Sequence, residues 1–379
     1  MTATREKKQK PQKKSMSLPS FRSFFFCFMS IFSLALIVKN ADIAIQYMQA
    51  GLRLCAASVI PSLFPFMVIS ELLVAGGLGK LLERFAGRFF SQLFGISGKA
   101  SAAVLLGLLC GFPVGAKTTV FLYDKGLITK KEAERALTFC NIPSSGFLIS
   151  TVGLSLFFDR AFGIFLYVAA LVAAFLSGLL GRFIFGKQHN EPTSGNDPLP
   201  PVSVNTFTTA VSSATASMLS VCAYVVFFSS VIGCLSHVIS RLSLHDTLAT
   251  LLFSFFEISS GVSAASHSPT ITAALFCGFA IGWSGLSVHF QILSLCSGRS
   301  FSFTPYFLSK LFQGVFCAVA SYFYAKWKSP AFSPSMQSAP AILFDENQLR
   351  QTFIITLVFF FCVILFFRKW RKTSLAGNI

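Results

Sequence analysis

Long runs of apolar residues constrain this chain more than any other feature of its sequence. Only 12% of the residues are charged, against about 25% in an ordinary soluble domain, and 46 of the 379 residues are phenylalanine. So few charged side chains could not coat the surface of a large soluble helical bundle. The sequence therefore predicts an all-α transmembrane protein. Four runs reach or approach the roughly 20 apolar residues that a helix needs to cross a bilayer: Phe24–Val38, Ala161–Leu180, Leu219–Val238 and Phe353–Phe367.

The net charge of +17 is distributed unevenly along the chain. Basic residues crowd the amino-terminal tail, and Arg368, Lys369, Arg371 and Lys372 directly follow the last apolar run. Basic clusters beside membrane spans are retained on the cytoplasmic side, so we expect a multi-pass cell-membrane protein with both termini in the cytoplasm. Nucleic acid is the rival partner for a basic tail. The clusters adjoin spans and contain no interleaved aromatic residues, so we expect no nucleic-acid partner.

Polar stretches divide the chain into segments and predict about eight to ten membrane segments, some of them re-entrant. Within the first half, Gly79–Lys99 mixes apolar with basic residues, as expected of an amphipathic helix at the membrane interface. We expect a basic cytoplasmic tail over 1–20, a first transmembrane helix and its connection over 21–50, a first repeat over 51–186, a polar linker over 187–206, a second repeat over 207–328, a second polar linker over 329–350, and a C-terminal transmembrane helix with a basic tail over 351–379.

The two halves of the chain contain three similar motifs in the same order. The second copy is shorter, and its missing residues fall where the first copy has the amphipathic stretch and a charged loop. Insertions confined to connections are typical of a duplicated fold. We expect the two copies to be inverted if each crosses the membrane an odd number of times. The matching pairs are Ser58–Phe66 with Ser220–Phe228, Gly111–Gly115 with Glu257–Gly261, and Ile142–Gly146 with Ile281–Gly285.

Glycine, proline and serine interrupt the apolar runs at four of these motifs: Gly111–Gly115, Ile142–Gly146, Glu257–Gly261 and Ile281–Gly285. Every backbone polar group in hydrocarbon needs a partner, so an interrupted helix persists only where protein or a water-filled cavity surrounds it. A kink, or close packing of helices at glycine, is the alternative for any single interruption. Interruptions at matching positions in two halves favour the substrate site of a secondary transporter.

Ionisable residues inside these segments sharpen that hypothesis, because a charge in the bilayer centre is expensive and usually faces a cavity. Lys117 and the free amides of the broken helices would hold an anionic or polar substrate, and Glu257 or His289 would carry a coupling proton or organise a cation. Lys117 could instead snorkel or pair with Glu257, and His289 could be packed and hydrogen-bonded. The candidate substrate-binding residues are Gly111, Pro113, Gly115, Lys117, Asn141, Ser144, Ser145, Glu257, Ser259, Ser260, Trp283, Ser284, Ser287 and His289.

No catalytic motif is present, and we expect neither an enzyme nor a cofactor or metal site. The ten cysteines lie singly in apolar stretches and are expected to pack as small hydrophobic residues. Glu132 and Glu134 lie in the charged loop, where we expect a solvated helix start and not an acid pair.

Several of these motifs resemble the YlbJ-type sporulation integral membrane proteins of endospore-forming bacteria. The resemblance covers roughly residues 45–330 and rests on four segments: Pro61–Phe66, Gly111–Lys117, Phe139–Pro143 and Gly282–His289. It implies two Gate-like, or nucleoside-recognition, repeats similar to those of concentrative nucleoside transporters. It also implies a role in a membrane around the forespore, where such proteins are linked to the movement of dipicolinate, an aromatic dicarboxylate.

The sequence thus predicts a secondary transporter or facilitator of a small polar or anionic metabolite, such as a dipicolinate-like dicarboxylate. A nucleoside transporter and a non-transporting protein of spore-envelope assembly are the alternatives. The expected partners are the lipid bilayer, the solute, and a coupling proton or sodium ion, and a homo-oligomer is left open.

Overall fold

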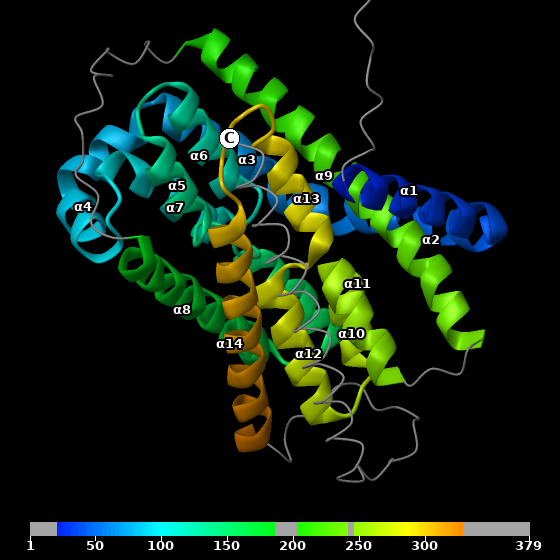
Figure 1. The fold of residues 1–379 in the computed structure, drawn as a ribbon. Helices are drawn as coiled ribbons and strands as arrows, with labels where there is room; N and C mark the ends of the chain where they lie inside the picture. Colours follow the sequence, from blue (N-terminus) through cyan, green and yellow to red (C-terminus); the bar gives the residue numbers. More distant parts are fainter. Residues whose placement is uncertain (1–20, 186–202, 242–245, 329–379) are drawn as a thin grey trace, which may run out of the picture.

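The chain folds as a bundle of helices in a computed structural model that describes residues 21–185, 203–241 and 246–328 (Figure 1). Within these ranges there is no β-strand, which confirms the all-helical prediction. The predicted tail over 1–20, the linker over 329–350 and the C-terminal helix over 351–379 lie outside the described residues. The linker predicted over 187–206 ends earlier, because Val204 already begins a helix.

The described part of the first half, residues 21–185, contains eight α-helices and two π-helical segments. The first two helices meet at 103°, and the amphipathic α4 meets α5 at 86°. The elements are α1 (Phe21–Lys39), α2 (Ala41–Leu54), a π-helix (Cys55–Val59), α3 (Ile60–Ala75), α4 (Leu78–Phe94), α5 (Gly98–Cys110), α6 (Val114–Asp124), α7 (Lys130–Leu137), a second π-helix (Phe147–Leu156) and α8 (Arg160–Phe185).

The second half begins with the longest described helix, which packs across α2, and ends with a helix that packs along α12 (Figure 1). Glycines at the contact between α12 and α14 allow this close approach, since a Cβ on Gly278 or Gly282 would collide with the backbone of α14. The elements are α9 (Val204–Arg241), α10 (Asp246–Phe256), α11 (Ile258–Ser266), α12 (Thr270–Trp283), α13 (Gly285–Leu295) and α14 (Thr304–Lys328).

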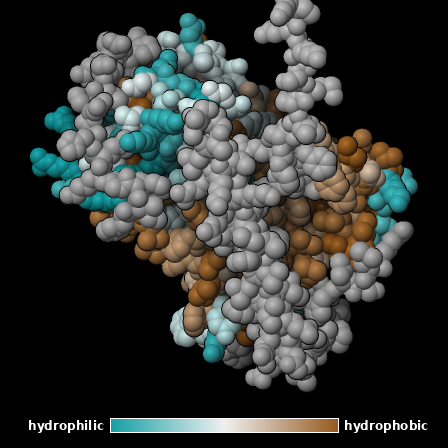
Figure 2. Space-filling model, in the orientation of Figure 1, coloured by the Kyte–Doolittle hydropathy of each residue, from teal (hydrophilic) through white to brown (hydrophobic). Residues whose placement is uncertain are grey.

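Three stretches of the described chain are long and apolar enough to cross a membrane: Arg160–Arg182, Val204–Ile239 and Thr270–Leu295. The number rises to five if the bent pairs α1–α2 and α4–α5 each form one span. The prediction of eight to ten segments also counted shorter interrupted stretches and the C-terminal helix. Figure 2 shows hydrophilic side chains gathered mainly at the end of the molecule where α4, α6 and α7 lie.

Two pairs of short helices form hairpins of re-entrant length. A helix of about 11 residues spans about 17 Å, roughly half of a hydrocarbon core about 30 Å thick. In the α5–α6 hairpin, a Cβ on Gly107 would lie 2.7 Å from the Cα of Gly115. In the α10–α11 hairpin, a Cβ on Gly261 would lie 2.8 Å from the backbone nitrogen of Ser254. Glycine at each contact lets two half-length helices lie back to back.

An ion pair joins the two halves at the hydrophilic end. Arg299 lies in the connection after α13, and Asp124 is the last residue of α6. The Nε of Arg299 donates to the Oδ1 of Asp124 at 2.7 Å. The Arg299 guanidinium lowers the pKa of the Asp124 carboxyl below its ordinary value. Glu134 of α7 accepts a hydrogen bond of 2.7 Å from the backbone nitrogen of Ser302, close to the same point.

Gly115→Ala should destabilise the protein, because the new methyl group would collide with the carbonyl of Cys140 and lie 3.0 Å from its Sγ. Overpacking of this kind costs about 1–3 kcal/mol. Gly146→Ala is a matched control, since Gly146 has φ of −60° and a methyl group added there would meet nothing within 4 Å. Thermal unfolding of the full-length protein in detergent should show a lower midpoint for Gly115→Ala alone. Equal midpoints for the two variants would contradict the close packing of α6 against Cys140.

Candidate functional site

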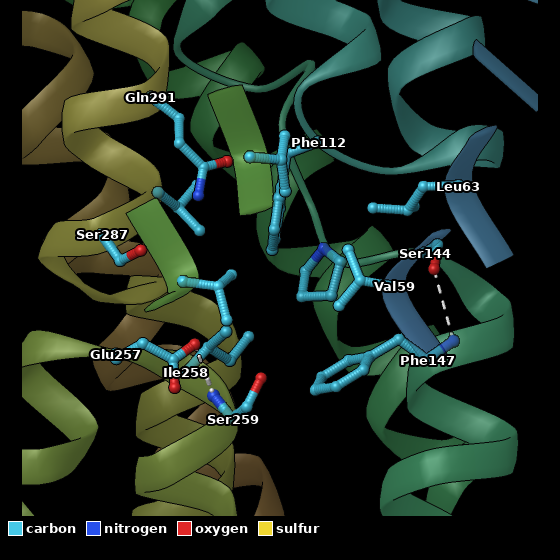
Figure 3. A pocket seen from close by; sticks show the side chains of 14 residues that line it. Val59, Leu63, Phe112, Ser144, Phe147, Glu257, Ile258, Ser259, Ser287 and Gln291 are labelled. Atoms are coloured by element: carbon cyan, nitrogen blue, oxygen red, sulfur yellow. Dashed lines mark hydrogen bonds between the residues drawn. The ribbon is translucent and has the colours of Figure 1, made fainter. Parts of the chain in front are cut away.

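A cavity of about 50 Å³ lies between the two halves, at the points where their helices are interrupted (Figure 3). Such a space holds water but no larger solute, since one water needs about 10–15 Å³ of this kind of volume. The first half and α9 contribute mainly apolar side chains, and the second half contributes most of the polar ones. The lining residues are Val59, Leu63, Phe112, Pro143, Ser144, Phe147, Val221, Val225, Glu257, Ile258, Ser259, Ser287, Val288 and Gln291.

The tip of the α5–α6 hairpin forms one wall of the cavity. Gly111 has φ of +84°, and a Cβ there would lie 2.6 Å from the backbone nitrogen of Ser144, so the turn requires glycine. Phe112 donates its N–H to the carbonyl of Ile142 at 2.9 Å. Pro113 precedes α6 and is buried, but it does not line the cavity. The first two interrupted segments of the sequence are therefore in direct contact.

Asn141 supplies the partner that the start of α6 lacks. Its Oδ1 accepts from the backbone nitrogen of Ala116 at 3.1 Å, and its Nδ2 donates to the carbonyl of Leu137 at 3.3 Å. The side chain is fully buried, so Asn141 caps a helix from another segment and does not reach the cavity. Sequence reasoning placed Asn141 at the site, and the structure gives it a supporting position behind the wall.

Ser144 and Ser145 follow this segment and differ in position. Ser144 is buried, lines the cavity and accepts at Oγ from the backbone nitrogen of Phe147 at 3.3 Å, at the start of the helical turn that leads into the π-helix. Ser145 is half-buried and is not among the lining residues. Only the first of the two predicted serines therefore faces the cavity.

Glu257 interrupts the second hairpin and is the charged residue of the cavity wall. It is the non-helical residue between α10 and α11, whereas Ser259, Ser260 and Gly261, which the sequence placed in the interruption, lie in the first turns of α11. Its carboxylate accepts from the backbone nitrogens of Ser259 at 3.0 Å and Ser260 at 2.7 Å. A carboxylate at a helix N-terminus is stabilised by the helix dipole. Of the broken-helix amides that were expected to hold an anionic substrate, those of Ser259 and Ser260 at the start of α11 are thus already occupied by Glu257.

Two polar side chains on one face of α13 are buried without a partner among the described residues. They are the Ser287 hydroxyl and the Oε1 of Gln291, four residues later, and both line the cavity. Buried polar atoms are nearly always hydrogen-bonded, so an orphaned pair facing a cavity marks a place for water or solute. Figure 3 shows the Gln291 amide on the side of the cavity opposite Leu63 and Ser144.

Trp283, Ser284 and His289 do not line the cavity. Trp283 donates its Nε1–H to the carbonyl of Phe255 at 3.0 Å, and His289 Nδ1 lies 2.8 Å from the Tyr306 hydroxyl in α14. These side chains pack α12 and α13 against α10 and α14. The predicted alternative of a packed, hydrogen-bonded histidine describes His289 in the structure.

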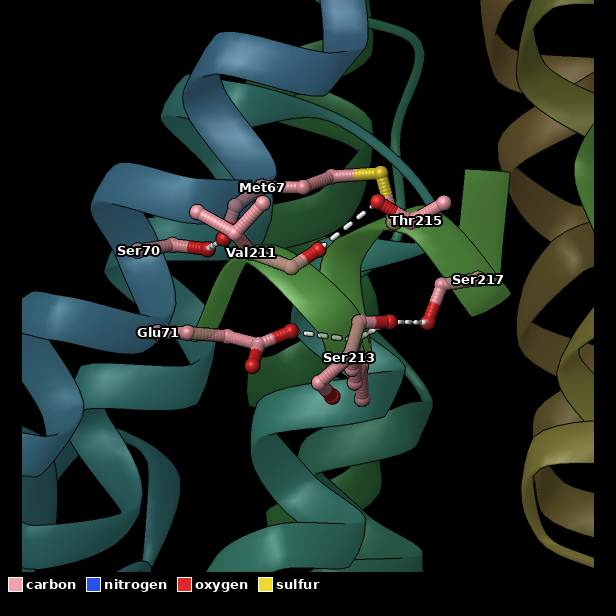
Figure 4. A network of polar contacts seen from close by, with 8 residues as sticks. Met67, Ser70, Glu71, Val211, Ser213, Thr215 and Ser217 are labelled. Atoms are coloured by element: carbon pink, nitrogen blue, oxygen red, sulfur yellow. Dashed lines mark hydrogen bonds and ion pairs between the residues drawn. The ribbon is translucent and has the colours of Figure 1, made fainter. Parts of the chain in front are cut away.

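Lys117 is paired with Glu71 of α3, and it also donates to the carbonyl of Ser213 in α9 at 2.8 Å. Figure 4 shows Glu71 directed toward the Ser213 turn of α9. Lys117 does not line the cavity, and the predicted alternative of a Lys117–Glu257 pair is wrong. Glu71 is an ionisable residue in an apolar run, so the reasoning that identified Lys117 could have found it too.

The carboxylate of Glu132 is buried, which corrects the expectation of a solvated helix start. It forms a capping box with Thr129, and its Oε1 accepts from the backbone nitrogen of Ser97 at 2.8 Å. The connection between α4 and α5 folds over this end of α7 and removes it from water. Glu134 remains half-buried at the edge of the same region.

Among the fourteen predicted site residues, Ser144, Glu257, Ser259 and Ser287 line the cavity. Together with the long apolar helices, these residues define an α-helical integral membrane protein with a largely apolar cavity between its halves that contains a few polar groups. The chain is 25% identical over 343 residues to the sporulation integral membrane protein YlbJ of Bacillus subtilis strain 168. The match covers 80% of this chain and 83% of that protein, and it confirms the predicted resemblance to YlbJ-type proteins. No protein-family profile matches the chain, and no solved structure matches it.

Lys117→Met should lower the thermal midpoint, because it leaves the Glu71 carboxylate without its cation. The two side chains are 18% and 22% exposed, so the loss should fall between the about 0–1 kcal/mol of an exposed pair and the about 3–5 kcal/mol of a broken buried one. The double variant Lys117→Met, Glu71→Leu should regain most of that loss, while the exposed control Lys131→Met should be neutral. Additive losses in the double variant would show that the pair is not coupled.

Proposed function

We propose that this protein is a secondary transporter or facilitator that moves a small polar solute across a membrane during sporulation, with the cavity between the two halves as its binding site. The observation that supports this best is the meeting of both hairpins' interruptions at one cavity that contains the Glu257 carboxylate. Interrupted helices at membrane depth are tolerated where they line such a cavity, and transporters use them to bind solutes.

In this conformation the cavity is too small for a solute, and one layer of contacts that would have to part can be followed along two helices. On α3, Leu63 lines the cavity, Met67 is buried one turn later, and Glu71 follows after another turn. On α9, Val221 lines the cavity, and Ser213, whose carbonyl accepts from Lys117, lies about two turns earlier. The Glu71–Lys117–Ser213 contacts would therefore have to separate for a solute to enter between α3 and α9.

The lining indicates which solutes the site would suit. Among the described residues it contains one carboxylate, hydroxyl groups, an amide and the rings of Phe112 and Phe147, and no lysine or arginine. A dipicolinate-like dianion, implied by the resemblance, would need Lys117 released from Glu71, or protons taken up by the dianion or by Glu257. A neutral solute with an aromatic ring and hydrogen-bond donors, such as a nucleoside, fits the lining without that change and is the second candidate.

Proteoliposomes containing the purified protein would distinguish these functions. Uptake of radiolabelled dipicolinate, competed by unlabelled dicarboxylates, would support the first candidate. Uptake of nucleosides, unaffected by dipicolinate, would support the second. Absence of uptake of either class by folded protein, together with a spore-envelope defect in cells lacking it, would favour the non-transporting alternative and contradict the proposal.

Glu257→Gln and Ser287→Ala should each reduce uptake by about fivefold to a hundredfold, since a lost buried hydrogen bond or charge in a binding site costs about 1–3 kcal/mol. Ser145→Ala is the matched control, because Ser145 lies beside the same interruption as Ser144 but outside the lining. Uptake rates should be normalised to the amount of folded protein measured by size-exclusion chromatography. Equal effects of Ser145→Ala and Ser287→Ala would contradict the assignment of the cavity as the binding site.

A further inference from the structure

Lys310 is the most unusual charged residue of the described chain, and neither the motifs nor the proposed function uses it. It lies in the first half of α14, is fully buried, and has no carboxylate partner among the described residues. A lone ammonium ion in an apolar interior costs several kcal/mol unless its surroundings compensate for the lost water. Such a group requires a physical explanation.

The compensation comes from three oxygen atoms that carry no formal charge. The ammonium group donates to the backbone carbonyl of Asn141, to the side-chain Oε1 of Gln313 at 3.1 Å, and to the hydroxyl of Ser284 at 3.4 Å. Carbonyl and hydroxyl oxygens are the ligands with which membrane proteins replace the hydration shell of an alkali cation. The surroundings of Lys310 therefore have the chemistry of a monovalent cation site.

The three oxygens come from both halves of the fold, and two of them belong to interrupted segments. Asn141 belongs to the interrupted segment of the first half, and Ser284, with φ of +72°, is the interruption between α12 and α13 in the second. Gln313 also donates to the carbonyl of Thr138 at 2.9 Å, next to the same first-half segment. One positive charge thus links both interruptions immediately behind the cavity wall.

We infer that Lys310 is a built-in cation that occupies the coupling-ion site between the two halves, so that the protein needs no bound sodium or potassium ion there. On the proposed function, the charge that changes during the transport cycle is then the proton on Lys310, and transport is coupled to protons and independent of sodium. The titratable groups that face Lys310 are Cys140, His289 and Cys317, and no carboxylate is among them.

Substitution of the lysine by a small residue tests the site without any transport measurement. Lys310→Ala empties the space and leaves the three oxygens, whereas Lys310→Met fills it with an apolar chain of similar length. Thermal midpoints of the full-length protein would be measured in choline chloride and in sodium, potassium or ammonium chloride at equal ionic strength. Ammonium and potassium ions are close in size to the lysine head group and should bind best.

The wild type should have the same midpoint in all four salts. Lys310→Ala should unfold several degrees lower in choline chloride and recover, in a saturable manner, with potassium or ammonium ions, while Lys310→Met should not recover. An Lys310→Ala variant whose midpoint is the same in choline as in every small cation would overturn the inference. A wild type that is itself stabilised specifically by sodium or potassium ions would also overturn it.

If Lys310→Ala yields no folded protein, uptake by the wild type decides the question. Replacement of sodium by choline should leave uptake unchanged, and a pH gradient should drive it. Sodium-dependent uptake would refute the built-in cation while leaving the proposed transport function intact. Conversely, cation rescue of Lys310→Ala in a protein that transports nothing would retain the cation site and remove the proposed function.

Discussion

The structure depends on one constraint: every backbone group freed by an interrupted helix must find a partner inside an apolar environment. The two hairpins satisfy this locally. Asn141 caps α6 from the neighbouring segment of its own half, and Glu257 caps α11 with its own carboxylate. Because the hydrogen-bond partners of each hairpin tip come from the same half of the chain, the unwound backbone can persist deep in the membrane without bound water. The cavity can therefore be small and largely apolar in this conformation.

Much of this fold could be predicted from the sequence, because its strongest signals are local. Apolar length identifies α8 and α9, and the Gly-Phe-Pro string identifies the tip of the first hairpin at Gly111. The interruption at Glu257 is predicted at the right place but too long, since serine and glycine after a capping carboxylate start a helix as readily as they end one. Boundaries of this kind depend on which side chain supplies the cap, and periodicity does not report that.

The candidate site was predictable only in part, because pairing between distant segments leaves no local signal. Lys117 is exceptional in its apolar run, as the sequence indicates, but its partner Glu71 lies 46 positions earlier on another helix. Gln291 and Lys310 were not predicted as site residues, although Lys310, like Lys117 and Glu71, is an ionisable residue inside an apolar run. Four predicted residues line the cavity, and the others lie behind its wall or pack elsewhere. Whether a side chain faces the cavity depends on the rotation of its helix about its own axis and not on its distance in sequence from an interruption.

The distribution of polar contacts between the halves indicates how the cavity could open without unfolding the hairpins. Contacts that cap the hairpin tips stay within one half, whereas those of Lys310, of Gln313, of Lys117 with Ser213, and of Arg299 with Asp124 cross between halves. A movement of one half against the other would break the crossing contacts and keep the caps. The crossing contacts of Lys310 and Gln313 are both buried, but Lys310 carries a charge, so its ammonium group would lose the most compensation on separation. Any state in which the halves part must therefore supply this site with water, with a different oxygen, or with a neutral amine.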